Sequence, residues 1–240
     1  MRVSVVIPAL NEAGNIGRLV QETYDTLPAE VLGEVIVVDD GSDDATPREI
    51  AALIDSNALP GLRYLRHGER SGQSAAMRTG ILAASHPVIA TMDGDGQNDP
   101  RDYPALLALV ESGRFDLACG WRVDRHDSTL RRLMSKIANT FRGAILRDGV
   151  HDAGCQLRVM RREVREAFFP MELMQSFIPA LAVAAGFRVG EMPVRHHPRA
   201  QGDSKYGLGR LWWRPAAAMI GLRWKIWRGR TPRRPASPPP

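Results

Sequence analysis

The most informative segment of the sequence reads Met92-Asp93-Gly94-Asp95-Gly96-Gln97-Asn98-Asp99-Pro100. It begins at the end of the last of four short apolar runs that are rich in β-branched residues. These runs cover Val3 to Ile7, Glu34 to Asp39, Leu62 to Leu65 and Val88 to Met92, and helix-like stretches separate them at Ala13 to Leu27, Thr46 to Ser56 and Ser74 to Ala84. Because parallel strands need crossover connections, this alternation predicts an α/β fold with a mostly parallel central sheet and helices on both faces.

Polar clusters follow three of the four runs. They are Asn11-Glu12, the acidic stretch from Asp39 to Asp44, and the segment from Asp93 to Gln97. Ligands of open parallel sheets bind outside the carboxyl ends of the strands. We therefore expect one edge of the sheet to carry the chemistry.

The second half of the chain alternates less regularly. We expect a helix at Pro100 to Ser112, a strand at Phe115 to Cys119, an Arg-rich helix at Ser128 to Leu146, an apolar segment at Gln156 to Met160, a helix around Phe177 to Gly186 and a strand at Arg188 to Val194. This mixed pattern is more consistent with completing one domain than with an independent fold. The sequence predicts one α/β domain over residues 1–205, basic Trp-rich helices over 206–230 and a disordered Pro-rich tail over 231–240.

Composition excludes several classes of protein. A chain of 240 residues with 44% hydrophobic content can build a sizeable core, which excludes disorder of the whole chain. The two cysteines, Cys119 and Cys155, lack the close spacing of a zinc or redox site and favour a reducing cytoplasm. No apolar run approaches the roughly 20 residues of a spanning helix, and the N-terminal apolar run is too short for a signal peptide. We expect neither export nor a transmembrane span.

The positive charge is concentrated at the C-terminus. From Lys205 onward the chain carries nine Lys or Arg residues and no acidic residue, so this segment contributes +9 and the remainder −4 to the formal net charge of +5. On a helical wheel, Arg210, Arg214, Lys225 and Arg228 share one face, and Leu208, Trp212, Met219, Leu222 and Ile226 share the opposite face. This pattern suits a helix in an anionic membrane interface. A helix packed on the core and a tail that binds single-stranded nucleic acid are the alternatives.

The segment after the fourth strand predicts a metal site. Alternate positions of an extended segment face the same way, so Asp93, Asp95 and the Gln97 amide oxygen can converge on one hard cation. Gly94 and Gly96 would let a diphosphate approach the backbone. Oxygen ligands of this kind favour Mg²⁺ or Mn²⁺. The alternative is a solvated Asp-Gly turn.

Five blocks, in order along the chain, resemble those of a known family. They are Val5 to Glu12 (VVIPALNE), Val37 to Thr46 (VVDDGSDDAT), Gly72 to Gly80 (GQSAAMRTG), Met92 to Pro100 (MDGDGQNDP) and Arg199 to Tyr206 (RAQGDSKY). The sequence is similar to family 2 glycosyltransferases with the GT-A fold, and within them to the dolichyl or polyprenyl phosphate sugar transferases such as dolichol-phosphate mannosyltransferase. The last block indicates the lipid-phosphate branch.

The resemblance implies a role for each matching position. The residues expected to line the nucleotide pocket are Pro8, Leu10, Asn11 and Glu12, and Asp40 is expected to contact the base or ribose. Asp93, Asp95 and Gln97 would hold the metal. Arg122, Arg131 and Ser135 would face the phosphates, and the last block would place Arg199, Ser204 and Lys205 over the diphosphate or the acceptor phosphate.

Three features depart from the family pattern. Gly96 stands where many relatives have an apolar residue, and Gln73-Ser74 replaces the more frequent Lys-Gly, which can alter sugar or acceptor preference without removing the metal site. The Gln-x-x-Arg-Trp motif of processive synthases is absent, so processive polymerisation is disfavoured.

The reaction expected from this pattern is transfer of a single hexose from a nucleotide sugar, of the GDP-mannose or UDP-glucose type, to a polyprenyl phosphate. It would use Mg²⁺ or Mn²⁺ and invert the anomeric centre. It would take place at the inner face of the cell membrane, where the protein would bind peripherally to the anionic lipid surface. Asp95, Arg122 and Arg131 would stabilise the leaving diphosphate. No nucleic acid partner is expected.

Two other functions remain open at this point. In the first, the acceptor is a hydroxyl of a lipid or saccharide, which needs a carboxylate as general base. Asp152 is the candidate general base. In the other interpretation, Asp152 caps or turns the loop before Gln156 and has no chemical role. In the second, the protein binds a nucleotide sugar or nucleic acid without turnover.

Overall fold

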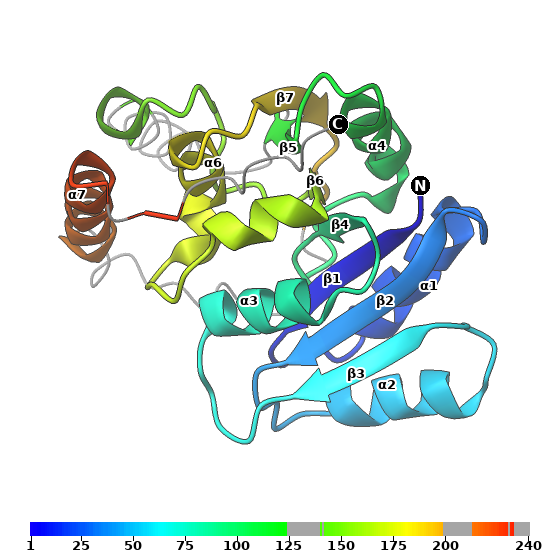
Figure 1. Ribbon diagram of the computed structural model, residues 1–240. Helices are drawn as coiled ribbons and strands as arrows, with labels where there is room; N and C mark the ends of the chain where they lie inside the picture. Colours follow the sequence, from blue (N-terminus) through cyan, green and yellow to red (C-terminus); the bar gives the residue numbers. More distant parts are fainter. Residues whose placement is uncertain (124–139, 141, 199–212, 230, 233–240) are drawn as a thin grey trace.

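The computed structural model describes residues 1–123, 140, 142–198, 213–229 and 231–232. A seven-stranded sheet forms its centre, with the order β3-β2-β1-β4-β6-β5-β7 (Figure 1). Its strands are β1 (Val3–Ala9), β2 (Leu32–Asp39), β3 (Leu62–Arg66), β4 (Val88–Thr91), β5 (Leu117–Arg122), β6 (Arg158–Arg161) and β7 (Val189–Val194). Each lies on a run that the sequence predicted as a strand or an apolar segment, so the α/β prediction is confirmed.

The sheet is mostly parallel, with one reversed strand. The pairings of β1 with β2 and β4, of β2 with β3, and of β5 with β7 are parallel. β6 lies between β4 and β5 and is antiparallel to both. The polar clusters that follow β1, β2 and β4 consequently lie at one edge, as predicted.

Helices cover both faces of the sheet. α1 (Ile16–Thr26), α2 (Thr46–Asp55) and α4 (Tyr103–Glu111) pack on one face, and α3 (Gln73–Ala83) and α6 (Met174–Ala184) on the other. Short 3-10 segments, η1 (Pro100–Asp102) and η2 (Arg162–Ala167), precede α4 and follow β6. The alternation of β1 explains the two layers, because Val5 and Ile7 join the first core and Val6 joins the second.

Glycine sets the distance between α3 and the sheet. A β-carbon at Gly80 would lie 2.3 Å from Val6 Cγ1, far inside van der Waals contact. Only glycine therefore lets α3 lie this close to β1, and the close packing fixes where the first turn of α3 meets the carboxyl edge of the sheet.

The C-terminal part adds α7 (Trp213–Trp227). Of the predicted helix at Ser128 to Leu146, residues 142–146 are helical and most of the rest lies outside the described residues. The predicted tail, 231–240, is described only at 231–232. Among the helices that the structure describes, none has both the length and the apolar character needed to cross a membrane.

Candidate functional site

The residues that the resemblance assigns to the nucleotide pocket gather where β1 and β2 end: Pro8, Leu10, Asn11, Glu12 and Asp40. Asn11, with a φ of 52°, donates from Nδ2 to Asp43 Oδ1 at 2.6 Å and accepts from Asp43 N at 3.0 Å. Asn11 N donates to Ser42 Oγ at 2.9 Å, and Glu12 N donates to Thr46 Oγ1 at 2.9 Å. The two loops are thus bound together into one wall.

Asp40 fixes the loop that precedes α3. Its carboxylate is buried and accepts from Ser71 N at 2.9 Å and from Gly72 N at 2.7 Å, and His67 Nδ1 lies 2.8 Å from it. These oxygens hold the protein's own backbone, so Asp40 shapes the wall between β2 and α3. Its direct contact with a base or ribose stays a prediction.

The predicted metal ligands lie together in the loop after β4. Asp93, Asp95 and Gln97 are each partly buried, and Gln97 N donates to Asp95 Oδ1 at 3.1 Å. A β-carbon at Gly94 would lie 2.7 Å from the backbone oxygen of Pro8. Glycine is therefore required for the loop to approach the end of β1 this closely.

The charges in this loop suit a divalent cation. Burial and the neighbouring Asp95 carboxylate raise the pKa of Asp93 to about 7, because each of them disfavours the charged form of Asp93. Carboxylate and amide oxygens are ligands that Mg²⁺ and Mn²⁺ prefer. Within the part of the chain that the structure describes, no three His, Cys, Asp or Glu side chains are grouped to hold a metal ion. The predicted ligands, two carboxylates and one amide, are a donor set of the oxygen type that such a cation prefers.

A chain of hydrogen bonds leads from Asp93 to α6. Gln73 Nε2 donates to Asp93 Oδ1 at 2.6 Å, Gln175 Nε2 donates to Gln73 Oε1 at 3.3 Å, and Ser74 Oγ donates to Gln175 Oε1. Gln73 and Ser74 are two of the residues that depart from the family pattern. Gln175 was not predicted, although a glutamine beside the apolar run that starts at Phe177 is a signal that could have identified it.

Arg158 is a second residue that the sequence did not single out. It is fully buried at the start of β6 and donates to Gln156 Oε1 at 2.9 Å, to the backbone oxygen of Gln175 at 2.7 Å and to that of Ala153 at 2.8 Å. Its charge lowers the pKa of Asp93, against the larger opposing effects of burial and Asp95. An arginine inside an apolar strand is the signal that could have marked it.

Arg122 and Asp152 form a buried bidentate ion pair. Arg122 Nε donates to Asp152 Oδ2 at 2.7 Å, and its second terminal nitrogen donates to Oδ1 at 2.9 Å. Asp152 N in turn donates to Glu191 Oε1 at 3.1 Å. Both Asp152 oxygens accept from the guanidinium, which fixes the carboxylate against Arg122 at the end of β5. This geometry favours the loop-fixing interpretation of Asp152 over the general base.

The loop that carries the predicted metal ligands, residues 93–97, is here called the metal loop, and it is also held by the segment after β7. His197 N donates to the backbone oxygen of Gln97 at 2.9 Å, and His197 Nε2 lies 3.0 Å from Asp99 Oδ2. Burial favours the neutral form of Asp99, but hydrogen bonds from Arg101 and His197 hold the pKa of this carboxyl well below its usual range. The segment after β7 therefore closes over the loop through an ion-pair cluster.

Other predicted phosphate-binding residues lie outside the described residues. They are Arg131, Ser135, Arg199, Ser204 and Lys205. Their assigned roles stay predictions.

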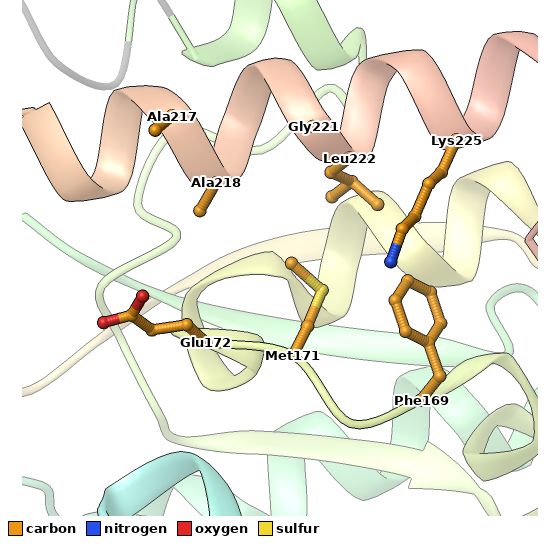
Figure 2. A pocket seen from close by; sticks show the side chains of 8 residues that line it. All are labelled: Phe169, Met171, Glu172, Ala217, Ala218, Gly221, Leu222 and Lys225. Atoms are coloured by element: carbon orange, nitrogen blue, oxygen red, sulfur yellow. The ribbon is translucent and has the colours of Figure 1, made fainter.

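The described part of the apolar face that the helical wheel identified packs on the core, as in the alternative interpretation of this helix and not as a membrane contact; Leu208 and Trp212 lie outside the described residues. Leu222 is buried, and Met219 and Ile226 are partly buried against the same cluster. Figure 2 shows Met171 reaching toward α7 and Lys225 Nζ over the Phe169 ring, 4.8 Å from its centroid, beside a cavity of about 240 Å³.

A different stripe of α7 faces outward. Ile220 is 63%, Trp224 44% and Trp227 74% exposed. Their spacing of four and three residues places them on one side of the helix. The helix thus has one apolar side that packs on the core and a second apolar side that is exposed to solvent.

Comparison with known proteins shows the following likenesses. The family model described as glycosyl transferase family 2 matches residues 4–169. The chain is 39% identical over 214 residues to the dodecaprenyl-phosphate galacturonate synthase of Rhizobium johnstonii, covering 88% of this chain and 63% of that protein. It is 35% identical over 213 residues to the undecaprenyl-phosphate 4-deoxy-4-formamido-L-arabinose transferase of Salmonella paratyphi B, covering 88% and 64%. The chain therefore spans somewhat less than two thirds of the length of these two relatives.

Solved structures share the fold. The glucosyl-3-phosphoglycerate synthase of Mycobacterium tuberculosis, crystallised with Mn²⁺, UDP-glucose and phosphoglyceric acid, superposes with a TM-score of 0.70 at 20% identity, covering 93% of this chain and 80% of that one. The mixed sheet with helices on both faces is thus the GT-A fold.

Proposed function

The chain belongs to glycosyl transferase family 2, and on this premise we propose that it transfers one sugar from a nucleoside-diphosphate sugar to a polyprenyl phosphate, assisted by Mg²⁺ or Mn²⁺. The observation that carries the proposal is the pair of carboxylates, Asp93 and Asp95, which Gly94 holds against the end of β1. The names of both relatives describe the synthesis of a polyprenyl-phosphate sugar or the transfer of a sugar to a polyprenyl phosphate, which supports the acceptor. Their sugars differ, so the relatives alone leave the sugar open.

The chemistry requires charge neutralisation more than a nucleophilic side chain. An acceptor phosphate oxygen attacks the anomeric carbon, the bond from that carbon to the diphosphate oxygen breaks, and the electron pair leaves with the nucleoside diphosphate. A divalent cation on Asp93, Asp95 and Gln97 would supply Lewis-acid stabilisation of that leaving group. A phosphate monoester has its second pKa near 6 and is largely dianionic at neutral pH, so the acceptor needs no general base.

The described side chains have separate tasks in this reaction. Gln73 orients Asp93 through its 2.6 Å hydrogen bond. Arg122 acts on Asp93 as a nearby positive charge and would attract the donor diphosphate on the same side. Asp152 keeps Arg122 in place through both of its oxygens.

Release of nucleoside diphosphate tests the proposal. The full chain would be incubated with a panel of nucleotide sugars and Mn²⁺, with undecaprenyl phosphate, with undecaprenol or with no acceptor. We expect release only with undecaprenyl phosphate, and none from Asp95→Asn. Asp55→Asn, which changes an exposed carboxylate at the end of α2, is the matched control and should behave as wild type. Equal release with undecaprenol would support the hydroxyl acceptor, and no release with any acceptor would support a binding protein.

We further propose that the protein works at the inner face of the cell membrane as a peripheral protein. Support comes from the exposed stripe of Ile220, Trp224 and Trp227 on α7, which the exposed Arg223 and Arg228 accompany. Tryptophan and basic side chains on a surface helix suit an anionic lipid interface, with about 1 kcal/mol of attraction for each basic residue near the surface.

Vesicle flotation at low and high salt tests the membrane contact. Wild-type protein should float with anionic phosphatidylglycerol vesicles at low salt and less at high salt. Replacing Trp224 and Trp227 together by glutamate should abolish flotation. Trp121→Glu, on β5, should leave it unchanged. Equal flotation of all three proteins, or none, would reject this contact.

A further inference from the structure

A cavity opens beside the metal loop, between α3 and the start of α6. It has a volume of about 660 Å³, in the range of small-molecule sites. Gln73, Ser74 and Gln175 line it, and Gln73 also donates to Asp93. The cavity therefore adjoins the first of the proposed metal ligands.

The polar wall of this cavity is held in place from three directions. Asp40 accepts a hydrogen bond from Gly72 N at 2.7 Å, and Asp93 accepts one from the Gln73 side chain. The Gln175 side chain forms hydrogen bonds with the side chains of both Gln73 and Ser74. These bonds link the ends of β2 and β4, and also α6, to the first turn of α3. Side chains fixed in this way give a preformed site that needs little ordering when a ligand binds.

Arg78 is the cation in this wall. Its side chain lines the cavity and is partly buried, and its Nε is fully buried without a hydrogen-bond partner among the described residues. The acidic residue that lines the same cavity, Glu172, is exposed to solvent. Nε is sealed from the cavity and does not itself meet a ligand. Arg78 forms no ion pair with a described carboxylate, however, so its partly exposed side chain leaves a positive charge in the cavity wall that is suited to an anionic oxygen from a ligand.

The spacing along α3 indicates which part of a ligand reaches Arg78. Arg78 follows Gln73 by five positions, which corresponds to about 7.5 Å along a helix axis. The sugar of a nucleoside-diphosphate sugar is attached to the phosphate next to the metal, so it would enter the cavity beside Gln73. An anionic group that reaches Arg78 would then sit on the far side of that sugar ring.

Resting on the function proposed above, we propose that Arg78 binds a carboxylate on the transferred sugar, so that the donor is a nucleoside-diphosphate hexuronate. The guanidinium would pair with the carboxylate at C6, and Gln73, Ser74 and Gln175 would bind the ring hydroxyls. A hexose with a hydroxymethyl group at C6 would leave Arg78 unpaired and bind more weakly.

Calorimetric titration of the full chain, with Mn²⁺ present, tests the assignment. UDP-galacturonate and UDP-galactose differ only in the group at C6. We expect the wild type to bind UDP-galacturonate at least about tenfold more tightly than UDP-galactose, because a hydrogen bond between charged groups contributes at least that factor to the affinity. Arg78→Gln should abolish that preference without weakening the binding of UDP-galactose, and Arg78→Lys should keep part of it. Arg48→Gln, which changes an exposed arginine on α2, is the matched control and should keep the full preference.

Several outcomes would overturn the proposal. They are equal affinity of the two donors for the wild type, an unchanged preference in Arg78→Gln, and binding of neither donor. An Arg78→Gln protein that retains the donor preference but binds undecaprenyl phosphate less tightly would place the acceptor phosphate on Arg78 instead. If the wild type shows the donor preference but transfers nothing to undecaprenyl phosphate, the proposed acceptor is wrong and the assignment of Arg78 stands.

Discussion

Substituting Asp152 with asparagine tests whether this carboxylate holds Arg122 or takes a proton from an acceptor. The Asp152 side chain is 4% and the Arg122 side chain 14% exposed, and their two hydrogen bonds measure 2.7 and 2.9 Å. Asparagine has nearly the same shape but lacks the charge. The substitution therefore leaves the Arg122 guanidinium largely buried without its counter-ion.

The structure allows the size of the effect to be worked out. Removing one partner of a buried ion pair costs about 3–5 kcal/mol. We take the lower limit of about 3 kcal/mol, because the amide oxygen of the asparagine still accepts one bond and Arg122 keeps some contact with water. For a domain of this size, each kcal/mol lowers the melting temperature by about 2–4 °C, so the expected decrease is about 6–12 °C.

Urea unfolding and nucleoside diphosphate release, measured on the same preparations, provide the assay. Arg122→Gln should destabilise by a comparable amount, and the double variant should cost clearly less than the sum of the two, because the pair is lost only once. Glu22→Gln is the control, since its ion pair with Arg18 is 2.8 Å long but solvent-exposed on α1 and should contribute less than about 0.5 kcal/mol. A loss below about 1 kcal/mol in Asp152→Asn, together with a rate at least about a hundredfold lower, would refute this reasoning and restore Asp152 as a general base.

Three further outcomes follow from the metal loop and its supports. Asp95→Ala should lower the transfer rate by about a hundredfold or more, and EDTA should lower the wild-type rate similarly, because both remove stabilisation of the leaving diphosphate. A folded Asp95→Ala protein with a near-normal rate would reject the metal assignment. Gly94→Ala should weaken Mn²⁺-dependent nucleotide binding, since the new β-carbon would lie 2.7 Å from Pro8 O, whereas Gly143→Ala, with nothing within 4 Å, should bind normally in the same titration. The folded-state pKa of Asp99 is depressed, so the stability that its charged form contributes is present above the unfolded pKa of about 3.9 and is lost as the pH falls below that value. The difference in unfolding free energy between wild type and Asp99→Asn should therefore shrink from about pH 6 to about pH 3. A constant difference would contradict this.

The strands and the acidic edge could be predicted because they depend on local patterns. Each strand lies on an apolar run of the sequence, and Asp93 and Asp95 come directly after one of them. Once the first four runs are taken as parallel neighbours, their following loops must meet. No long-range information is needed for that step.

The partners of these residues could not be predicted, because they come from distant parts of the chain. Gln175 is 102 residues from Gln73, and Asp152 is 30 residues from Arg122. Which helix packs beside α3 depends on the strand order and on which face each connection crosses. A single sequence gives little information on either, so sequence reasoning could name the proposed cation ligands but not the side chains that contact them.

The direction of β6 explains both what sequence reasoning found and what it missed. In a wholly parallel sheet, functional residues follow strands. β6 is antiparallel to β4 and pairs Arg158 with Thr91, so the residues that precede β6 arrive at the edge where β4 ends. Arg158, which sequence reasoning missed, therefore acts on Asp93 from the N-terminal end of a strand, a position that a rule based on strand ends does not search. Because the same reversal brings the Gln175 backbone to Arg158, it also places α6 opposite α3 and forms the cavity to which we assign the sugar.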